Sequence, residues 1–407
     1  MADTLAGHAR PRSAGFADLR RAVEALLPLI EAEADAAEAQ SHQSDRVVTA
    51  LREAGLYSML LPRALGGGEL PFAEAMEIIA RLAWADASAG WCSMVAGVMS
   101  ASLGAFVSEE GARIVYGQGP DVTVAGNGVP RGYARRVPGG YMIRGHWAYG
   151  SGIHHAEWVH SGCFVTDDAG KPRHNAEGVP EIILAHHPKA SIVLKGNWDV
   201  LGLRATGSFD YTLKEPELFV PEALCYSFDG ARVQRGGPQY QIGLVGLTSW
   251  GHTSWALGVG RRALDELARL ARERADVFGK LTDSPSFRKS FAEAEAKFRA
   301  ASAFVRESWG DLADTIARGD APSVTQIALI RLAMRHIHDA LSEVTTFAHR
   351  TARGASLRAG TLQRCYRDAH AGTQHLLLAD EIAMECGRVL MGATGPGASW
   401  TMFGVKG

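Results

Sequence analysis

The chain has few of the features that mark secreted, nucleic-acid-binding or membrane proteins. Its 407 residues include five cysteines, an odd number at wide spacing, which favours neither a disulfide framework nor a metal-binding motif. The formal net charge is −2 without a run of like charge, so neither nucleic acid nor an anionic membrane is an expected partner. We find no charged-then-apolar leader and no apolar run of membrane-spanning length. These absences predict a globular cytoplasmic protein.

Two kinds of cofactor motif are also missing. No Gly-x-Gly-x-x-Gly element links a strand to a helix, so the chain has no evident site for a nicotinamide cofactor. The pairs His154-His155 and His186-His187 lack a third ligand at a familiar spacing, so we predict no metal site.

The periodicity of apolar residues divides the chain into three domains of an α+β multidomain fold. Residues 1–121 carry a helical period, including a segment at 88–106 that is apolar nearly all round and is expected to be buried. In residues 122–228, short runs rich in Val, Ile, Tyr and Trp alternate with turn residues, which predicts an antiparallel β domain. Residues 229–407 predict an antiparallel four-helix bundle. Its four periodic segments are 243–278, 286–318, 324–353 and 362–391.

The stretch 145–152 combines small residues with alternating aromatic and hydroxyl side chains. Trp147, Tyr149 and Ser151 follow a strand-like segment, so they are expected to point to one face. A flat aromatic face that ends in a hydroxyl could receive a planar heterocycle. A strand with aromatics on one side is more often part of a core, and the pattern by itself leaves both interpretations open.

Four motifs, in this order along the chain, resemble those of the flavin-dependent monooxygenases that share the acyl-CoA dehydrogenase fold. Those proteins are oxygenase components of two-component hydroxylases, such as those acting on p-hydroxyphenylacetate, 3-hydroxy-9,10-seconandrostatriendione and dibenzothiophene. The resemblance covers essentially the whole chain. The first motif is Tyr149, Ser151 and Trp158, an aromatic residue with a hydroxyl two residues later and a tryptophan seven beyond that. The second is Gly202–Ser208 followed by Phe219–Pro221, and the third is Arg274 with Phe278–Lys280. The fourth is Gln363–His370 followed by Gln374 and His375.

The resemblance implies the fold and assembly of that family. It implies an N-terminal helical domain, a central antiparallel β-barrel domain and a C-terminal four-helix bundle. In this fold the bundle generally mediates tetramerisation, so a homotetramer is expected.

The fourth motif separates two reaction types. Dehydrogenases of this fold commonly place a catalytic glutamate after the Arg-Asp pair, whereas Gly372–Leu377 contains no acid here. Without a carboxylate base, dehydrogenation of an acyl thioester has no evident proton acceptor. The imidazole of His370 suits hydroxylation, because its pKa lies near working pH and it can activate a phenol.

The resemblance further implies a mechanism and its residues. A separate NAD(P)H:flavin reductase supplies reduced FMN or FAD, and O₂ converts it to a C4a-hydroperoxide that hydroxylates an aromatic small molecule. Ser151 is the candidate for the contact to flavin N5 and His370 for substrate activation. The other candidates for cofactor binding are Asn127, Tyr149, Gly152, Arg274 and Phe278.

Trp91, Met99 and His370 are the candidates for the substrate pocket. Some relatives carry a histidine eight residues after the tryptophan that matches Trp91, where this chain has Met99, so a less polar or larger substrate is expected. Two alternatives stay open: a dehydrogenase-like oxidoreductase with tightly held FAD, and a catalytically silent scaffold. The first predicts a yellow protein and the second predicts no flavin affinity.

Overall fold

The computed structural model describes residues 15–175, 178–229, 231–273, 275–276, 279–402 and 404–406. The first third is helical, as predicted, and its helices begin at residues with capping side chains. Ser44 accepts a hydrogen bond from the Val47 amide at the start of α2, and Asp86 accepts one from the Ala89 amide at the start of α4. The helices are α1 (Phe16–Gln40), α2 (Asp45–Glu53), α3 (Phe72–Ala85), α4 (Ala87–Phe106) and α5 (Glu109–Tyr116).

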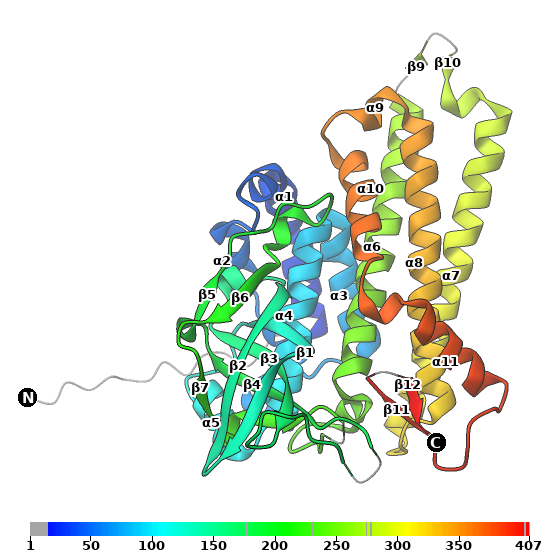
Figure 1. The fold of residues 1–407 in the computed structure, drawn as a ribbon. Coiled ribbons are helices and arrows are strands. Elements are labelled where there is room, and N and C mark those ends of the chain that lie inside the picture. Colours follow the sequence, from blue (N-terminus) through cyan, green and yellow to red (C-terminus); the bar gives the residue numbers. More distant parts are fainter. Residues whose placement is uncertain are drawn as a thin grey trace, which may run out of the picture.

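Helix α4 is the centre of the molecule. It contacts strand β1 on one side and the long helix α6 on the other, so it lies between the sheet and the C-terminal helices (Figure 1). Contrary to the expectation from the sequence, α4 is long and apolar enough to cross a membrane, but 89% of its most apolar window is buried inside the fold. The prediction that this segment is a buried core helix is confirmed.

The middle third is an eight-stranded sheet in the order β5-β6-β2-β1-β3-β4-β8, with β7 also paired to β2. Among the described residues the pairing is open at β5 and β8 and does not close into a barrel. The strands are β1 (Val124–Val137), β2 (Gly140–Gly150), β3 (Trp158–Thr166), β4 (Ile182–Pro188), β5 (Ile192–Leu194), β6 (Phe209–Leu213), β7 (Leu218–Pro221) and β8 (Cys225–Ser227).

The prediction of a purely antiparallel sheet is wrong at one pairing, because β1 and β3 run parallel. Strand β2 runs antiparallel to β1 and lies on the side of β1 opposite to β3. At the end of β2 the chain is therefore back at the end of the sheet where β1 began, and β3 starts from there. In this way β2 and the turn at Ile153–His155 supply the crossover that parallel neighbours require.

The last third is helical, and three of its helices are long: α6 (Gly243–Glu273), α7 (Pro285–Ala317) and α8 (Val324–Ala352). The predicted fourth helix is broken into α10 (Thr361–Gly372) and α11 (Asp380–Leu390). The break follows Gly372, a residue with low helix propensity, and the His375 imidazole then accepts the Leu377 amide to start a separate turn. Smaller elements are α9 (Gly354–Leu357), β9 (Ala275–Asp276), β10 (Gly279–Lys280), β11 (Ser399–Thr401) and β12 (Gly404–Lys406).

Candidate functional site

Strand β2 ends in a bulge that separates its aromatic side chains. The register against β6 shifts between Trp147 and Gly150, and Tyr149 has a left-handed backbone with φ 63°. Trp147 is buried, whereas Tyr149 is 60% exposed and lies edge-on to Trp198. The prediction that these residues and Ser151 share one face is therefore wrong, because the bulge turns Tyr149 outward. Backbone strain at a non-glycine residue is typical of functional sites.

The hydroxyl of Ser151 lies in a buried relay of hydrogen bonds. The Trp91 indole N–H donates to Ser151 Oγ over 3.0 Å, and Ser151 Oγ lies 2.7 Å from Ser208 Oγ. Ser208 Oγ is 2.6 Å from Thr206 Oγ1, which donates to the Leu203 carbonyl. Because an indole only donates and a carbonyl only accepts, every hydroxyl hydrogen must point from Trp91 toward Leu203. Ser151 therefore keeps one unused lone pair and has no free hydrogen.

The turn at residues 201–205, whose Leu203 carbonyl accepts the last hydrogen bond of this relay, is held in place by residues of the fourth motif. Leu203 has φ 56°, and its amide donates to Asp368 Oδ1 over 2.6 Å. Gly202 lies so close to α10 that an added Cβ would stand 2.1 Å from the Arg367 carbonyl oxygen. Burial, reinforced by the Asp86 carboxylate, raises the pKa of Asp368 to about 7.

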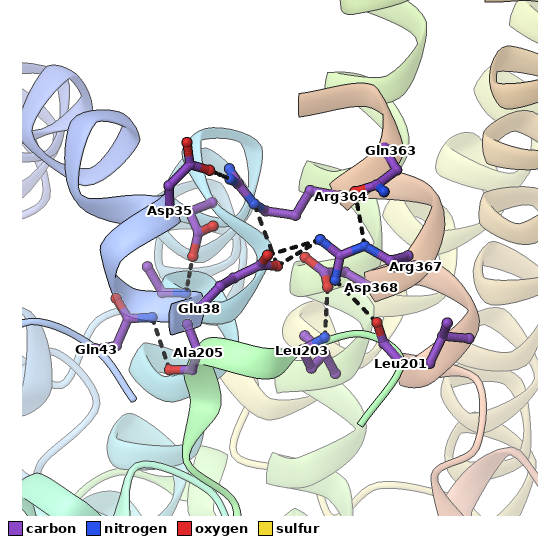
Figure 2. A network of polar contacts seen from close by, with 12 residues as sticks. Asp35, Glu38, Gln43, Leu201, Leu203, Ala205, Gln363, Arg364, Arg367 and Asp368 are labelled. Atoms are coloured by element: carbon purple, nitrogen blue, oxygen red, sulfur yellow. Dashed lines mark hydrogen bonds and ion pairs between the residues drawn. The ribbon is translucent and has the colours of Figure 1, made fainter. Parts of the chain in front are cut away.

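Figure 2 shows that the arginines of this motif join three segments of the chain. Arg367 binds both oxygens of Glu38 on α1 at 2.9 Å and donates to the Leu201 carbonyl at 3.0 Å. Arg364 pairs with Asp35 and Glu38. The motif therefore clamps α1, the 201–205 turn and α10 together, which is a structural role.

Trp91 also lies at the edge of a buried group of imidazole and indole rings. The centroid of its ring is 4.8 Å from that of His252, 5.1 Å from that of Trp255 and 6.3 Å from that of His375. The centroids of the His252 and His375 rings are 3.9 Å apart. Burial lowers the pKa of His375 to about 4, so this ring is neutral at pH 7. Since its Nδ1 accepts the Leu377 amide, its proton is on Nε2.

His370 lies elsewhere, on the side of α10 that faces α8. Its Nε2 is 3.1 Å from Thr346 Oγ1 and its ring meets Tyr366 edge-on at 4.5 Å. None of the contacts of the described residues joins it to Ser151 or Trp91. The structure thus brings His375, and not His370, to the ring that donates to Ser151.

The two remaining pocket candidates lie on one face of α4. Trp91, Val95 and Met99 recur at four-residue steps, and Val95 and Met99 are the half-exposed positions of an otherwise buried helix. Trp91, which donates to Ser151, stands at the start of this face, and the face is apolar along its length.

The other predicted cofactor residues have different surroundings. Asn127 donates to the Ala148 carbonyl over 2.6 Å and accepts the Val129 amide, so it braces the end of β2. Gly152 has φ 73°, a left-handed conformation that favours glycine, and its amide donates to the Thr206 carbonyl. Arg274 and Phe278 lie outside the described residues.

Three contributors were assigned no role from the sequence. Ser208 lies within the second motif, and His375 lies at the end of the fourth, five residues beyond His370. The third is His42, which joins His154 and His155 in one cluster, although it lies at no familiar ligand spacing from them. No spacing rule could find His42, because more than a hundred residues separate it from the pair.

The sequence matches two family models, one at each helical end. The model of the acyl-CoA dehydrogenase N-terminal domain matches residues 17–113, and that of the acyl-CoA dehydrogenase C-terminal domain matches residues 250–380. The indole-3-acetate monooxygenase of Pseudomonas putida is 32% identical over 402 residues, which cover 96% of this chain and 98% of the relative. The flavin-dependent monooxygenase oxygenase subunit HsaA of Rhodococcus jostii is 29% identical and covers 87% of this chain and 92% of its own.

Solved structures share the fold. XiaF from Streptomyces sp., in complex with FADH2 and glycerol, has a TM-score of 0.84 at 22% identity and covers 95% of this chain and 98% of its own. TdsC from Paenibacillus sp. A11-2, with FMN and indole, has a TM-score of 0.76 at 22% identity and covers 93% of this chain and 98% of its own. With the end-to-end similarity to monooxygenases, these matches show that the chain belongs to the flavin-dependent monooxygenases of the acyl-CoA dehydrogenase fold, as an oxygenase component.

Proposed function

We propose that this chain binds diffusible reduced flavin, FMNH₂ or FADH₂, supplied by a separate NAD(P)H:flavin reductase, and oxygenates an aromatic small molecule. The bound flavin supplies the activation of O₂. The protein's own residues bind and orient the ring, exclude water and handle protons. Two-component relatives support the separate reductase, and the lack of a nicotinamide motif agrees with it.

The observation that carries the proposal is the direction of the Ser151 relay. Ser151 Oγ receives the Trp91 N–H and gives its own hydrogen to Ser208, so it can only accept a further hydrogen bond. Reduced flavin carries a hydrogen on N5, whereas oxidised flavin has only an acceptor there. The relay therefore favours the reduced over the oxidised cofactor, as a diffusible reduced flavin requires.

The residues near Ser151 fit a planar aromatic ring. Tyr149, two residues before Ser151, is 60% exposed on a strained backbone. An exposed aromatic side chain next to a buried hydroxyl acceptor is suited to pack on a flavin. Gly152 permits the left-handed turn that holds Ser151 in place. Asn127 holds the end of β2 before this turn through its hydrogen bond to the Ala148 carbonyl.

Two histidines are candidates for activating the substrate. His370 carries the motif resemblance, but its Nε2 is engaged by Thr346. His375 is neutral with its proton on Nε2, and its ring centroid lies 6.3 Å from that of Trp91. A neutral imidazole does not give up its remaining proton at pH 7, but its Nε2–H can donate a hydrogen bond to a substrate oxygen that gains negative charge, so geometry favours His375 for that contact.

An indole derivative is the first substrate that we propose to test. The relative that matches this chain end to end is named for indole-3-acetate, and the Trp91–Met99 face is apolar enough for a fused ring. We further propose a cytoplasmic homotetramer with domains at 1–121, 122–228 and 229–407, in which α6, α7, α8 and α10 form the bundle.

The test is an anaerobic titration of the purified protein with reduced and with oxidised FMN and FAD. We expect reduced flavin to bind at least tenfold more tightly, and Ser151→Ala to remove most of that difference. Turnover with the reductase, O₂ and indole-3-acetate then identifies the product. Tighter binding of oxidised flavin would favour the dehydrogenase-like alternative, and no binding in either state would favour the scaffold.

A further inference from the structure

Three histidines from two distant segments meet beside the Ser151 turn. His42 lies in the link between α1 and α2, and His154 and His155 belong to the short turn that follows β2. One ligand nitrogen from each lies within 4.8 Å of the others, and all three residues are half-buried. Three convergent imidazoles are the donor set of many zinc sites.

The second nitrogen of two of these rings is already oriented. His42 Nδ1 lies 2.9 Å from the carbonyl oxygen of Gln43, and His155 Nε2 lies 2.9 Å from Asp45 Oδ1. Metal-binding histidines ordinarily donate their other N–H to a carbonyl or a carboxylate, which fixes the tautomer and the ring. These contacts leave His42 Nε2 and His155 Nδ1 as the lone-pair nitrogens. The His154 ring has no hydrogen-bond partner within the described part of the chain.

The cavity beside the rings suits an ion and not an organic ligand. The adjoining cavity of about 20 Å³ is lined by the three histidines and by Ser151, Gly152 and Thr206, among others. This volume holds one water-sized species.

We propose that His42, His154 and His155 bind one divalent transition-metal ion of the imidazole-preferring class, with Zn²⁺ as the expected occupant and water as the fourth ligand. The ion would tie the link between α1 and α2 to the turn that follows Ser151. The proposal is independent of the proposed reaction, because it concerns metal binding alone.

Metal binding requires one ring to move. His42 and His154 are stacked in parallel, with their ring centroids 3.7 Å apart. A coordinated metal lies near the plane of each imidazole, so the His154 ring, which no hydrogen bond among the described residues holds, must rotate out of the stack. Ligand nitrogens of a tetrahedral zinc site are about 3.3 Å apart, so the separation of up to 4.8 Å must also close.

The test is calorimetric titration of Zn²⁺ into tag-free, chelator-stripped protein. We expect one Zn²⁺ per chain at this site, a higher melting temperature with zinc, and loss of that binding step in His42→Asn and in His154→Asn. Asp45→Asn should weaken binding by about 10- to 100-fold, because it removes the partner that orients His155. His174→Asn is the matched control, since His174 is an exposed histidine outside the cluster.

Two further measurements separate loss of metal binding from loss of folding and report the coordination geometry. Each apo variant is checked by circular dichroism and melting temperature, and His42→Gln replaces His42→Asn if the latter does not fold. Co²⁺ serves as a spectroscopic probe, and a tetrahedral spectrum that disappears in His154→Asn is expected. Zinc binding by His42→Asn equal to that of the wild type, or no binding by the wild type, would overturn the proposal. The former result would show that zinc binds elsewhere on the chain.

Discussion

At the scale of single residues, the hydrogen-bond direction of one hydroxyl group sets which redox state of a flavin the candidate site would favour. Ser151 accepts from Trp91 and donates to Ser208, so its neighbours and not its own chemistry make it an acceptor. A serine in the same motif without Ser208 could rotate its hydrogen toward either redox form of the flavin. The selectivity that we propose is therefore a property of the relay.

Ser208→Ala tests this relay without touching Ser151. Ser151 then regains a free hydrogen, so the ratio of oxidised to reduced flavin dissociation constants should fall by about 2- to 10-fold, the worth of one hydrogen bond. The ratio is measured by anaerobic titration in both redox states. An unchanged ratio in a folded Ser208→Ala protein would mean that the relay does not set redox preference.

His375→Ala and His370→Ala separate the two histidine candidates. If His375 donates a hydrogen bond to the reacting substrate, its removal should lower kcat by about 10²- to 10³-fold, whereas His370→Ala should change kcat by less than about tenfold. Initial rates are measured at saturating reduced flavin. The reverse ranking would return the role to His370, as the motif resemblance predicts.

At the scale of elements, the end of α10 determines where His375 lies. Gly372 closes this helix against Trp255, and an added Cβ would stand 2.4 Å from Trp255 Cη2. The indole cannot move aside easily because its N–H is bonded to the Ala87 carbonyl. The break between α10 and α11 thus depends on a residue without a side chain.

Gly372→Ala should therefore lower the free energy of unfolding by about 1–3 kcal/mol through overpacking. Gly310→Ala is the matched control, because Gly310 lies inside α7 with nothing within 4 Å of an added Cβ. It should raise stability by about 0.5–1 kcal/mol. Urea unfolding measures both changes, and a neutral Gly372→Ala would show that Trp255 relaxes freely.

The clamp of α10 on the 201–205 turn should depend on pH. The pKa of Asp368 is raised to about 7 in the folded protein, from 3.8, chiefly by burial. A carboxyl group with a raised pKa favours folding while it is protonated, so its contribution falls as pH rises from about 4 to about 7. Asp368→Asn keeps an oxygen for the Leu203 amide and does not titrate.

The difference in unfolding free energy between Asp368→Asn and the wild type should therefore shift in favour of the variant as pH rises from 5 to 7, and level off above about 8. The slope cannot exceed about 1.4 kcal/mol per pH unit for one group. Urea unfolding at four pH values measures it. A constant difference would place the pKa of Asp368 near its ordinary value.

At the scale of the whole molecule, apolar side chains gather on the C-terminal segment. Leu376, Met384 and Met391 are 51%, 69% and 79% exposed, in and around α11. Exposed apolar clusters of this kind mark subunit contacts. In the homotetramer that we propose, this segment is a natural contact between copies.

Met384→Glu should accordingly lower the mass measured by light scattering from that of a tetramer to that of a dimer or monomer. Ile114→Glu is the control, because Ile114 is also exposed, at 44%, but lies on α5. If both variants keep the wild-type mass, the contact between subunits lies elsewhere.

Local patterns are enough to predict features that depend on residues a few positions apart. Apolar periodicity located the helical, sheet and helical thirds, and short motifs singled out Tyr149, Ser151 and the Arg-Asp pair. The same motifs implied the reaction class by resemblance, and the missing acid at Gly372–Leu377 argued against dehydrogenation.

Features that depend on residues distant in sequence came only from the folded chain. The parallel pairing of β1 with β3, the outward turn of Tyr149 and the break after Gly372 each arise from a neighbour supplied by another element. The direction of the Ser151 hydrogen bonds needed Trp91 and Leu203 at the two ends of the relay. The cluster of His42 with His154 and His155 required the folded chain, because no spacing relates them.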